Sequence, residues 1–239
     1  RHTVFVSLGG GVEAPAFNEI DPPAPFDTAT SINPFLKTTH STTLEAGARG
    51  VLREGSLKYD AAVYQIDVKD DFIPYDGGVY YFTAGKTRRQ GAELGLDWTP
   101  IERLSLRGAF SVSKNRYVEY KNNLGDFKDN KVAGLPTQIV HATGRYATRI
   151  GFFGELNTTW IGSYYADDAN RARVPAYALL GARVGYTGLF ETRTIHAFVG
   201  VENLADQHYV ESVFINGLNG QYFEPGLPRN FTAGLTIGL

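Results

Sequence analysis

The chain has 239 residues, with 23 basic and 25 acidic side chains that leave a formal net charge of −2. This near balance argues against nucleic acid as the main partner, because nucleic-acid-binding domains carry a clear excess of Lys and Arg. Cysteine is absent, which excludes disulfides, thiol nucleophiles and thiolate metal sites, and no apolar run reaches the length of a transmembrane helix.

Alternation of apolar with polar or small residues recurs along the chain and predicts about ten β-strands. The first segment, RHTVFVSL, places Val4, Val6 and Leu8 on one face. Weaker segments lie near residues 56–68 and 137–147. The clearest of the others, in chain order, are TLEAGARGVL, AELGLDW, LSLRGAFSV, FFGELNTTWIGSY, ALLGARVGY, TIHAFVGVEN and FTAGLTIGL. No stretch of comparable length fits the helical period better.

The predicted connections between these segments alternate in length. The glycines Gly9, Gly10 and Gly11 fall in the first long connection, where we expect a tight loop path. Short connections are predicted at residues 53–56, 99–103, 147–151 and 188–193, and long ones at 9–40, 69–79, 119–136, 165–173 and 204–227. This rhythm indicates an up-and-down antiparallel sheet. In outer-membrane barrels the short turns are periplasmic and the long loops extracellular.

Aromatic residues occur at both ends of the predicted apolar faces. Those beside short turns are Trp98, Tyr146, Phe152 and Tyr186, and those near a long loop are Trp160 and Tyr164. Two such girdles around an Ala, Leu and Val band are typical of lipid-facing strands. The opposite faces carry mid-strand polar residues, which a water-filled lumen tolerates: Glu45, Arg49, Glu93, Asp97, Arg107, Glu155, Asn157 and Arg183.

These patterns predict an all-β fold, an antiparallel up-and-down transmembrane β-barrel. Alternation alone also allows a soluble β-sandwich with its charged face toward solvent. The aromatic placement and the loop rhythm favour the barrel.

Several stretches, in order along nearly the whole chain, resemble TonB-dependent outer-membrane receptors of the ferric-siderophore type. They are VSLGGGVEAPAFNEI, NPFLKTTHSTTLEAGARG, AGKTRRQGAELGLDWTP, YYADDANRARVPAY, VENLADQHYVES and FEPGLPRNFTAGLTIGL. The most specific is the pattern V-x-N-L-x-D-x-x-Y, formed by Val201, Asn203, Leu204, Asp206 and Tyr209. The sequence departs from the family at Ala133 and Gln138, where Pro and His are more usual, and at Leu239, where the family usually ends in an aromatic residue.

The resemblance implies a 22-stranded barrel plugged by an N-terminal domain, in the bacterial cell outer membrane. Residues 1–239 would be its C-terminal β-barrel segment of about ten strands, with the plug and the N-terminal strands outside the sequence. Arg1 is accordingly interpreted as an internal residue of a longer parent, or as a processed start.

The function implied is active uptake of an iron chelate (siderophore) or a similar scarce nutrient, with no chemical reaction and no cofactor. The implied partners are the chelate, the TonB complex acting through the plug, and outer-membrane lipid and lipopolysaccharide. Three alternatives remain open at this point: a passive porin-like channel, a stand-alone ten-stranded outer-membrane barrel enzyme and a soluble β-domain.

Motifs for catalysis or metal binding are weak. GGGVEAP lacks the Lys-Ser/Thr that a phosphate loop requires, and the five histidines show no paired ligand spacing. The pairs Asp70-Asp71 and Asp167-Asp168 lie in predicted long loops, where we expect solvated charge, and neighbouring residues of an extended chain make poor catalytic dyads.

Tyrosines and arginines cluster in or beside the long loops and form the candidate ligand-binding set. Arginine suits anionic chelates through charge and bidentate hydrogen bonds, and aromatic rings suit planar chelators. The competing interpretation is that the tyrosines belong to the upper girdle and the arginines bind lipopolysaccharide or loop acids. The set is Tyr75, Tyr80, Tyr81, Arg88, Arg89, Arg171 and Arg173.

Overall fold

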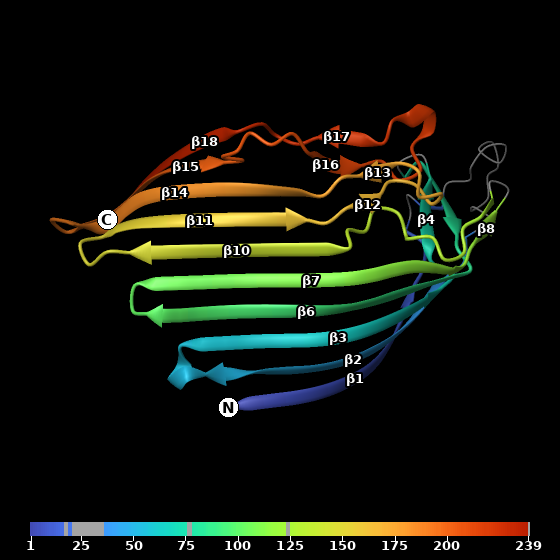
Figure 1. Ribbon diagram of the computed structural model, residues 1–239, viewed down its shortest axis with the longest axis horizontal. Helices are drawn as coiled ribbons and strands as arrows, with labels where there is room; N and C mark the ends of the chain where they lie inside the picture. The colour runs from blue at the N-terminus through green and yellow to red at the C-terminus, as the bar shows by residue number, and fades with distance from the viewer. Residues whose placement is uncertain (17–18, 21–35, 76–77, 123–124, 239) are drawn as a thin grey trace.

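The computed structural model describes residues 1–16, 19–20, 36–75, 78–122 and 125–238 (Figure 1). Ten strands form one curved antiparallel sheet in which every strand pairs with its neighbours along the chain, so the predicted ten-stranded up-and-down sheet is confirmed. The strands are β1 (His2–Glu13), β2 (Thr39–Leu52), β3 (Leu57–Lys69), β6 (Lys86–Ile101), β7 (Leu104–Glu119), β10 (Gln138–Ala147), β11 (Phe152–Ile161), β14 (Tyr177–Phe190), β15 (Arg193–Glu202) and β18 (Asn230–Gly238).

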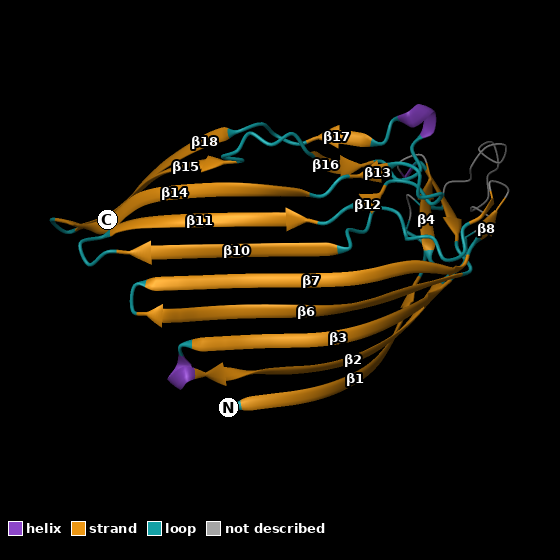
Figure 2. Cartoon of the chain, viewed as in Figure 1, coloured by secondary structure: helices purple, strands orange, loops and turns teal. Residues whose placement is uncertain are grey.

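The short and long connections lie at opposite ends of the sheet, as the loop rhythm predicts (Figure 2). At the turn end, on the left of the figure, the strands are joined by residues 53–56, 102–103, 148–151 and 191–192, the first containing the short 3-10 helix η2 (Arg53–Gly55). At the loop end, four connections each carry a two-stranded ribbon.

These ribbons lie beyond the loop end of the strands and bring the loop segments together. They are β4 (Phe72–Tyr75) with β5 (Tyr80–Thr83), β8 (Lys121–Asn122) with β9 (Gly125–Asp126), β12 (Tyr164–Tyr165) with β13 (Arg173–Val174), and β16 (Val210–Val213) with β17 (Phe223–Pro225). The last connection also holds the 3-10 helix η4 (Leu218–Gly220). No helix in the described residues is long and apolar enough to cross a membrane.

The prediction that Gly9, Gly10 and Gly11 lie in a loop is wrong. They continue β1 and pair with Thr43, Thr42 and Ser41 of β2. A ladder of backbone hydrogen bonds needs no side chains, so a run of glycines hides a strand from any rule based on alternation. The connection therefore shortens to residues 14–38, most of which, like Leu239, lie outside the described residues.

One face of the sheet is apolar although it is exposed. The strand register aligns a row across nine neighbouring strands: Leu52, Leu57, Trp98, Leu106, Gly144, Leu156, Ala182, Val201 and Phe231. Leu156 is 58% exposed and Phe231 77% exposed. Exposed apolar side chains that continue from strand to strand fit contact with lipid.

The opposite face carries charge. Lys58, Asp97 and Arg107 are aligned on β3, β6 and β7, and the Arg107 Nε donates to Asp97 Oδ1 at 2.7 Å. Further along, Arg145 pairs with Glu155 at 3.6 Å. Groups that keep their charge in mid-strand need water or a partner beside them, so this face is the lumen side of the sheet.

The aromatic residues at the turn end follow the predicted girdle. Phe152 and Tyr186 are register partners with ring centroids 5.1 Å apart, and Phe152 and Tyr146 are exposed. At the loop end, Trp160 also lies on the exposed apolar face, but Tyr164 does not, so that prediction is wrong. Tyr164 is 6% exposed, because the strand ends at Ile161 and the chain turns into the β12–β13 ribbon.

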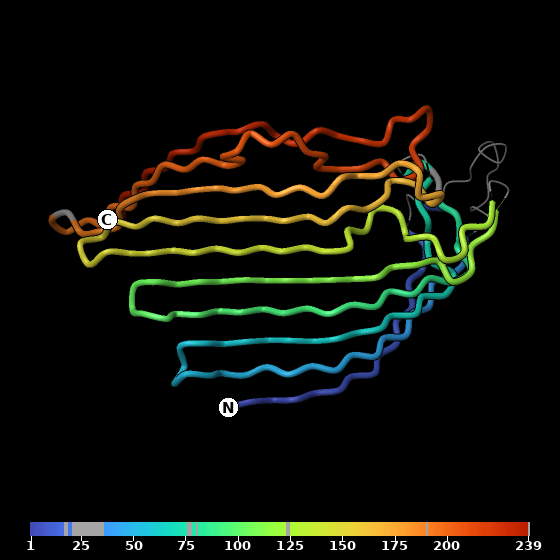
Figure 3. Tube along the Cα trace, viewed as in Figure 1, coloured from blue at the N-terminus to red at the C-terminus, as the bar shows by residue number. Residues whose placement is uncertain are grey.

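The largest packed core lies at the loop end rather than within the sheet. Six residues form it, with Leu135 and Ala169 packed against them: Ile73, Ala84, Tyr117, Tyr120, Phe127 and Val132. They come from the end of β7, the β4–β5 ribbon and the connection after β7. Figure 3 shows these segments gathered over one end of the strands. The loops thus form a packed structure of their own.

The two-faced sheet can be tested on neighbouring positions of β7. Phe110→Arg puts a guanidinium on the apolar face and should lower the free energy of unfolding in a bilayer by about 2–4 kcal/mol. Ala109→Arg puts the same charge on the lumen face and should cost less than about 1 kcal/mol. Urea unfolding of the full-length parent in lipid vesicles measures both, and equal losses would contradict this assignment of faces.

Candidate functional site

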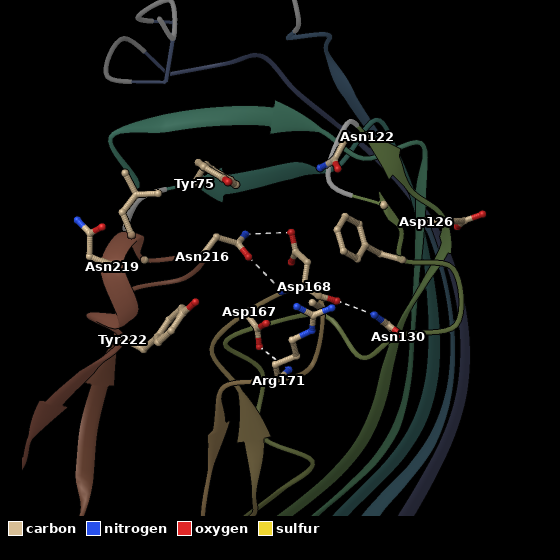
Figure 4. A pocket seen from close by; sticks show the side chains of 15 residues that line it. Tyr75, Asn122, Asp126, Asn130, Asp167, Asp168, Arg171, Asn216, Asn219 and Tyr222 are labelled. Atoms are coloured by element: carbon tan, nitrogen blue, oxygen red, sulfur yellow. Dashed lines mark hydrogen bonds between the residues drawn. The ribbon is translucent and has the colours of Figure 1, made fainter.

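The four ribbon-bearing connections surround a polar cavity of about 590 Å³ at the loop end (Figure 4). Most of its lining side chains are amides, carboxylates and tyrosines. The lining residues are Tyr75, Asn122, Gly125, Asp126, Phe127, Asn130, Asp167, Asp168, Ala169, Arg171, Asn216, Gly217, Leu218, Asn219 and Tyr222. A cavity of this size, bounded by several polar groups, is large enough for a small organic ligand.

Asp168 links four of the segments around the cavity. Its carboxylate accepts hydrogen bonds from the Tyr117 hydroxyl on β7 and from Asn216 Nδ2, the latter at 2.9 Å. Asn216 Nδ2 also donates to the Pro74 carbonyl of β4 at 2.9 Å, and Asn130 Nδ2 donates to the Asp168 carbonyl at 2.7 Å. The wall of the cavity is therefore held by one buried carboxylate and the amides around it.

The expectation that the loop acids are solvated is wrong for three of the four. Asp71 and Asp167 are each 8% exposed and Asp168 is 3% exposed. Burial raises the pKa of Asp168, and the hydrogen bonds from Tyr117 and Asn216 oppose that rise. Asp167 Oδ1 accepts the backbone N–H groups of Arg171 and Ala172 at 2.8 and 2.7 Å. Asp167 satisfies backbone donors of its own loop, whereas Asp71 and Asp168 accept side-chain donors from other segments.

The β4–β5 ribbon is anchored to the sheet through Asp71. Its Oδ2 accepts the Thr87 hydroxyl at 2.6 Å and Arg89 Nη2 at 2.7 Å, both from β6. One residue earlier, Arg88 Nε donates to Asp67 on β3 at 2.7 Å. Arg88 and Arg89 thus lie within a strand that begins earlier than the sequence indicates, and both are paired with acids.

The structure places the predicted site residues in different surroundings. Tyr75 and Arg171 line the cavity. Arg173 is on β13, where its Nη2 donates to Ser163 Oγ at 3.3 Å, and Tyr81 is on β5, opposite Pro74. Tyr80 pairs with Tyr75 through the backbone register.

Sequence reasoning missed the asparagines of the lining. Asn122, Asn130, Asn216 and Asn219 come from two different connections, and nothing in their local sequence marks them as neighbours. Asn tolerates positive φ better than most residues, and Asn216 and Asn219 adopt φ of 53° and 57°. Their being asparagine was therefore the one sequence signal available. Asn in a long loop can therefore indicate a structured loop.

The V-x-N-L-x-D-x-x-Y pattern forms a clamp between β15 and β18. Asn203 is 4% exposed, and its Nδ2 donates to the carbonyls of Gln207 at 2.9 Å and Leu227 at 3.1 Å. Asp206 Oδ1 accepts the Arg229 backbone N–H at 2.9 Å, which lowers the pKa of that carboxyl. The pattern therefore fastens the two arms of one connection, and its residues are absent from the cavity lining.

Tyr209 completes the clamp by packing on Gly226. The Gly226 backbone N–H donates to the Tyr209 carbonyl at 2.9 Å, and a Cβ added at Gly226 would lie 2.0 Å from the tyrosine ring. The Tyr209 ring also lies beside the Tyr177 ring, with centroids 4.9 Å apart. Glycine is required at position 226 for this close approach.

No group of three or more His, Asp or Glu residues in the described part of the chain is arranged to hold a metal ion. The uncharged amides and hydroxyls of the cavity can contact the periphery of an organic ligand through hydrogen bonds.

Comparison with known proteins gives a consistent family. A family model described as "TonB dependent receptor-like, beta-barrel" matches residues 1–204. The chain is 30% identical over 162 residues to the ferrioxamine receptor of Yersinia enterocolitica, covering 65% of this chain and 22% of that protein. It is 26% identical over 200 residues to the metal-pseudopaline receptor CntO of Pseudomonas aeruginosa, covering 81% of this chain and 27% of that protein.

Solved structures share the fold. The closed form of the ferric-catecholate import receptor Fiu from Escherichia coli K12 matches with a TM-score of 0.72 and 20% identity, over 97% of this chain and 32% of that one. The ferric yersiniabactin uptake receptor FyuA from Yersinia pestis matches with a TM-score of 0.73 and 20% identity, over 98% of this chain and 34% of that one. The chain thus spans about a quarter to a third of the length of these proteins.

Because the Asp168 carboxylate holds the loops together, we expect its replacement to destabilise the loops and leave the sheet unchanged. In Asp168→Asn an amide replaces an acceptor that takes two hydrogen bonds, so one partner is left unpaired at a cost of about 1–3 kcal/mol. We expect faster hydrogen exchange and proteolysis in residues 125–135 and 165–175, with the sheet unchanged. Asp129→Asn, at an exposed position in the connection between β7 and β10, should have no effect. Equal exchange in the two variants would show that Asp168 does not hold the loops.

The close packing of Tyr209 on Gly226 predicts that a larger side chain at position 226 destabilises the clamp. Gly226→Ala forces the Tyr209 ring out of its place, and overpacking of this kind costs about 1–3 kcal/mol. Gly9→Ala is the matched control, since its added Cβ meets no atom within 4 Å. Thermal unfolding of the full-length receptor should show a lower midpoint only for Gly226→Ala; an unchanged midpoint would mean that Tyr209 moves freely.

Proposed function

Because the chain belongs to the family of TonB-dependent receptor-like β-barrels, whose members lie in the bacterial outer membrane, we propose that its parent protein imports a metal chelate, in the first instance a ferric siderophore. The observation that carries this proposal is the convergence of four long connections on one polar cavity at the loop end. Loops held together by buried hydrogen bonds form a preorganised surface, which lowers the entropic cost of binding.

Residues 1–239 would supply the C-terminal ten strands of the barrel and part of its ligand-binding mouth. β1 and β18 are the edges of the sheet in the described part of the chain. Edge strands in a bilayer need partners, because lipid offers none to their backbone groups. We therefore propose that strands preceding Arg1 in the parent close the barrel, and that a plug in its lumen contacts the TonB complex.

The apolar and charged surfaces suggest the remaining partners. The exposed apolar face would contact outer-membrane lipid, and basic loop residues such as Arg173 would contact lipopolysaccharide phosphates. Arg173 is exposed at the loop end, where those phosphates would lie if the long loops are extracellular.

The enzyme alternative has little support. On the strands of the sheet, His2 bonds to Tyr59 at 2.9 Å, His141 to Thr159 at 2.9 Å and His196 to Thr187 at 2.7 Å. None of these three histidines is paired with a carboxylate that would orient it as a general base. We propose that the barrel binds and transports without a chemical step.

Transport can be measured in cells that lack the parent gene. Cells complemented with the full-length protein should accumulate a radiolabelled ferric chelate under iron limitation, and uptake should stop when a protonophore removes the energy source. Uptake that continues without energy would support the passive-channel alternative. Uptake equal to that of the empty strain with every metal chelate tried would contradict transport.

A further inference from the structure

The lining of the loop cavity has an excess of negative charge. Its ionisable residues are Asp126, Asp167, Asp168 and Arg171, three acids against one base. Even when Asp168 is left out of the count because it is only 3% exposed, two acids and one arginine line the cavity. Asp167 Oδ1 accepts two backbone N–H groups, and Asp126 is exposed.

The other arginines of the candidate set do not change this balance. Arg89 is paired with Asp71 and Arg88 with Asp67, at 2.7 Å in each case, and neither lines the cavity. Arg173 also lies outside the lining. The lining of the cavity therefore carries more acids than bases, which disfavours an anionic ligand there.

The remaining lining groups are uncharged hydrogen-bonding side chains and two aromatic rings. Figure 4 shows Tyr75 and Tyr222 on the side of the cavity nearer Asn219, with Asp126 on the other side. Tyrosine faces attract cations and pack on alkyl chains, and asparagine amides pair with carbonyl and amide groups. These are surroundings for a neutral or cationic ligand.

We propose that this cavity selects metal chelates that carry no net negative charge and present amide, hydroxyl or ammonium groups. The inference rests on the proposed function and narrows its substrate class. The proposal distinguishes two common forms of ferric chelate. Three hydroxamate groups, each a monoanion, neutralise Fe³⁺. Three catecholate groups, each a dianion, leave the complex strongly anionic. The cavity favours the first chemistry.

The test is binding of two probes to the purified full-length receptor: a neutral ferric trihydroxamate and an anionic ferric tricatecholate. We expect the neutral chelate to bind at least roughly tenfold more tightly at low salt, with the difference shrinking as salt screens the charges. Tighter binding of the anionic chelate would overturn the inference and leave transport standing. Failure of both probes to bind would also overturn the inference, and transport of other chelates would then be decided by the uptake assay.

Two charge variants test whether the selectivity between the chelates arises in this cavity. Asp126→Asn should improve binding of the anionic chelate roughly three- to tenfold, and Arg171→Gln should weaken it by a similar factor. Glu224→Gln is the matched control, because it removes the same charge at an exposed position of β17 outside the lining. An equal gain from Glu224→Gln and Asp126→Asn would show that only overall charge matters and would overturn the assignment to the cavity.

Discussion

Backbone hydrogen bonding inside a bilayer is the constraint from which the rest of this structure follows. Lipid offers no partners to N–H and C=O groups, so each strand must be paired along its length with both neighbours. The ladder meets that demand for every strand except the edges β1 and β18, and its period-two geometry gives every strand one face toward lipid and one toward the lumen. The apolar row from Leu52 to Phe231 and the charged row from Lys58 to Arg107 are two consequences of the same register.

Because both faces of the sheet are occupied in this way, the largest packed core and the buried acids lie at the loop end. The cluster around Tyr117 and Phe127 supplies apolar packing. Asp71 ties one ribbon to β6, and Asp168 joins three connections to the end of β7. A carboxylate accepts several hydrogen bonds at once, which suits it to loops whose donors have no ladder to join. Asp168 also lines the cavity, so a residue that holds the loops together also forms part of the cavity wall.

Sequence reasoning worked where one local rule governs the structure and failed where distant segments meet. Alternation alone was enough to predict ten strands and their faces, because register in a two-faced sheet is strongly specified. It missed Gly9 to Gly11, which have no side chains to alternate, and Tyr164, whose face is decided by the ribbon after β11. The burial of Asp168 depends on Tyr117 and Asn216, which are 51 and 48 residues away in the chain. The V-x-N-L-x-D-x-x-Y pattern was easy to recognise, but only its contacts with Leu227 and Arg229 show that it is a clamp.

The orientation of this sheet in the membrane can be measured most directly by cysteine labelling, since the chain contains no cysteine of its own. Lys128→Cys places a thiol among the long connections, and Ile150→Cys places one in an exposed short turn at the opposite end. With a membrane-impermeant maleimide on intact cells that carry the full-length receptor, position 128 should be labelled, and position 150 only after the outer membrane is permeabilised. Labelling of position 150 but not 128 on intact cells would place the cavity on the periplasmic side and contradict its role in capturing an external chelate.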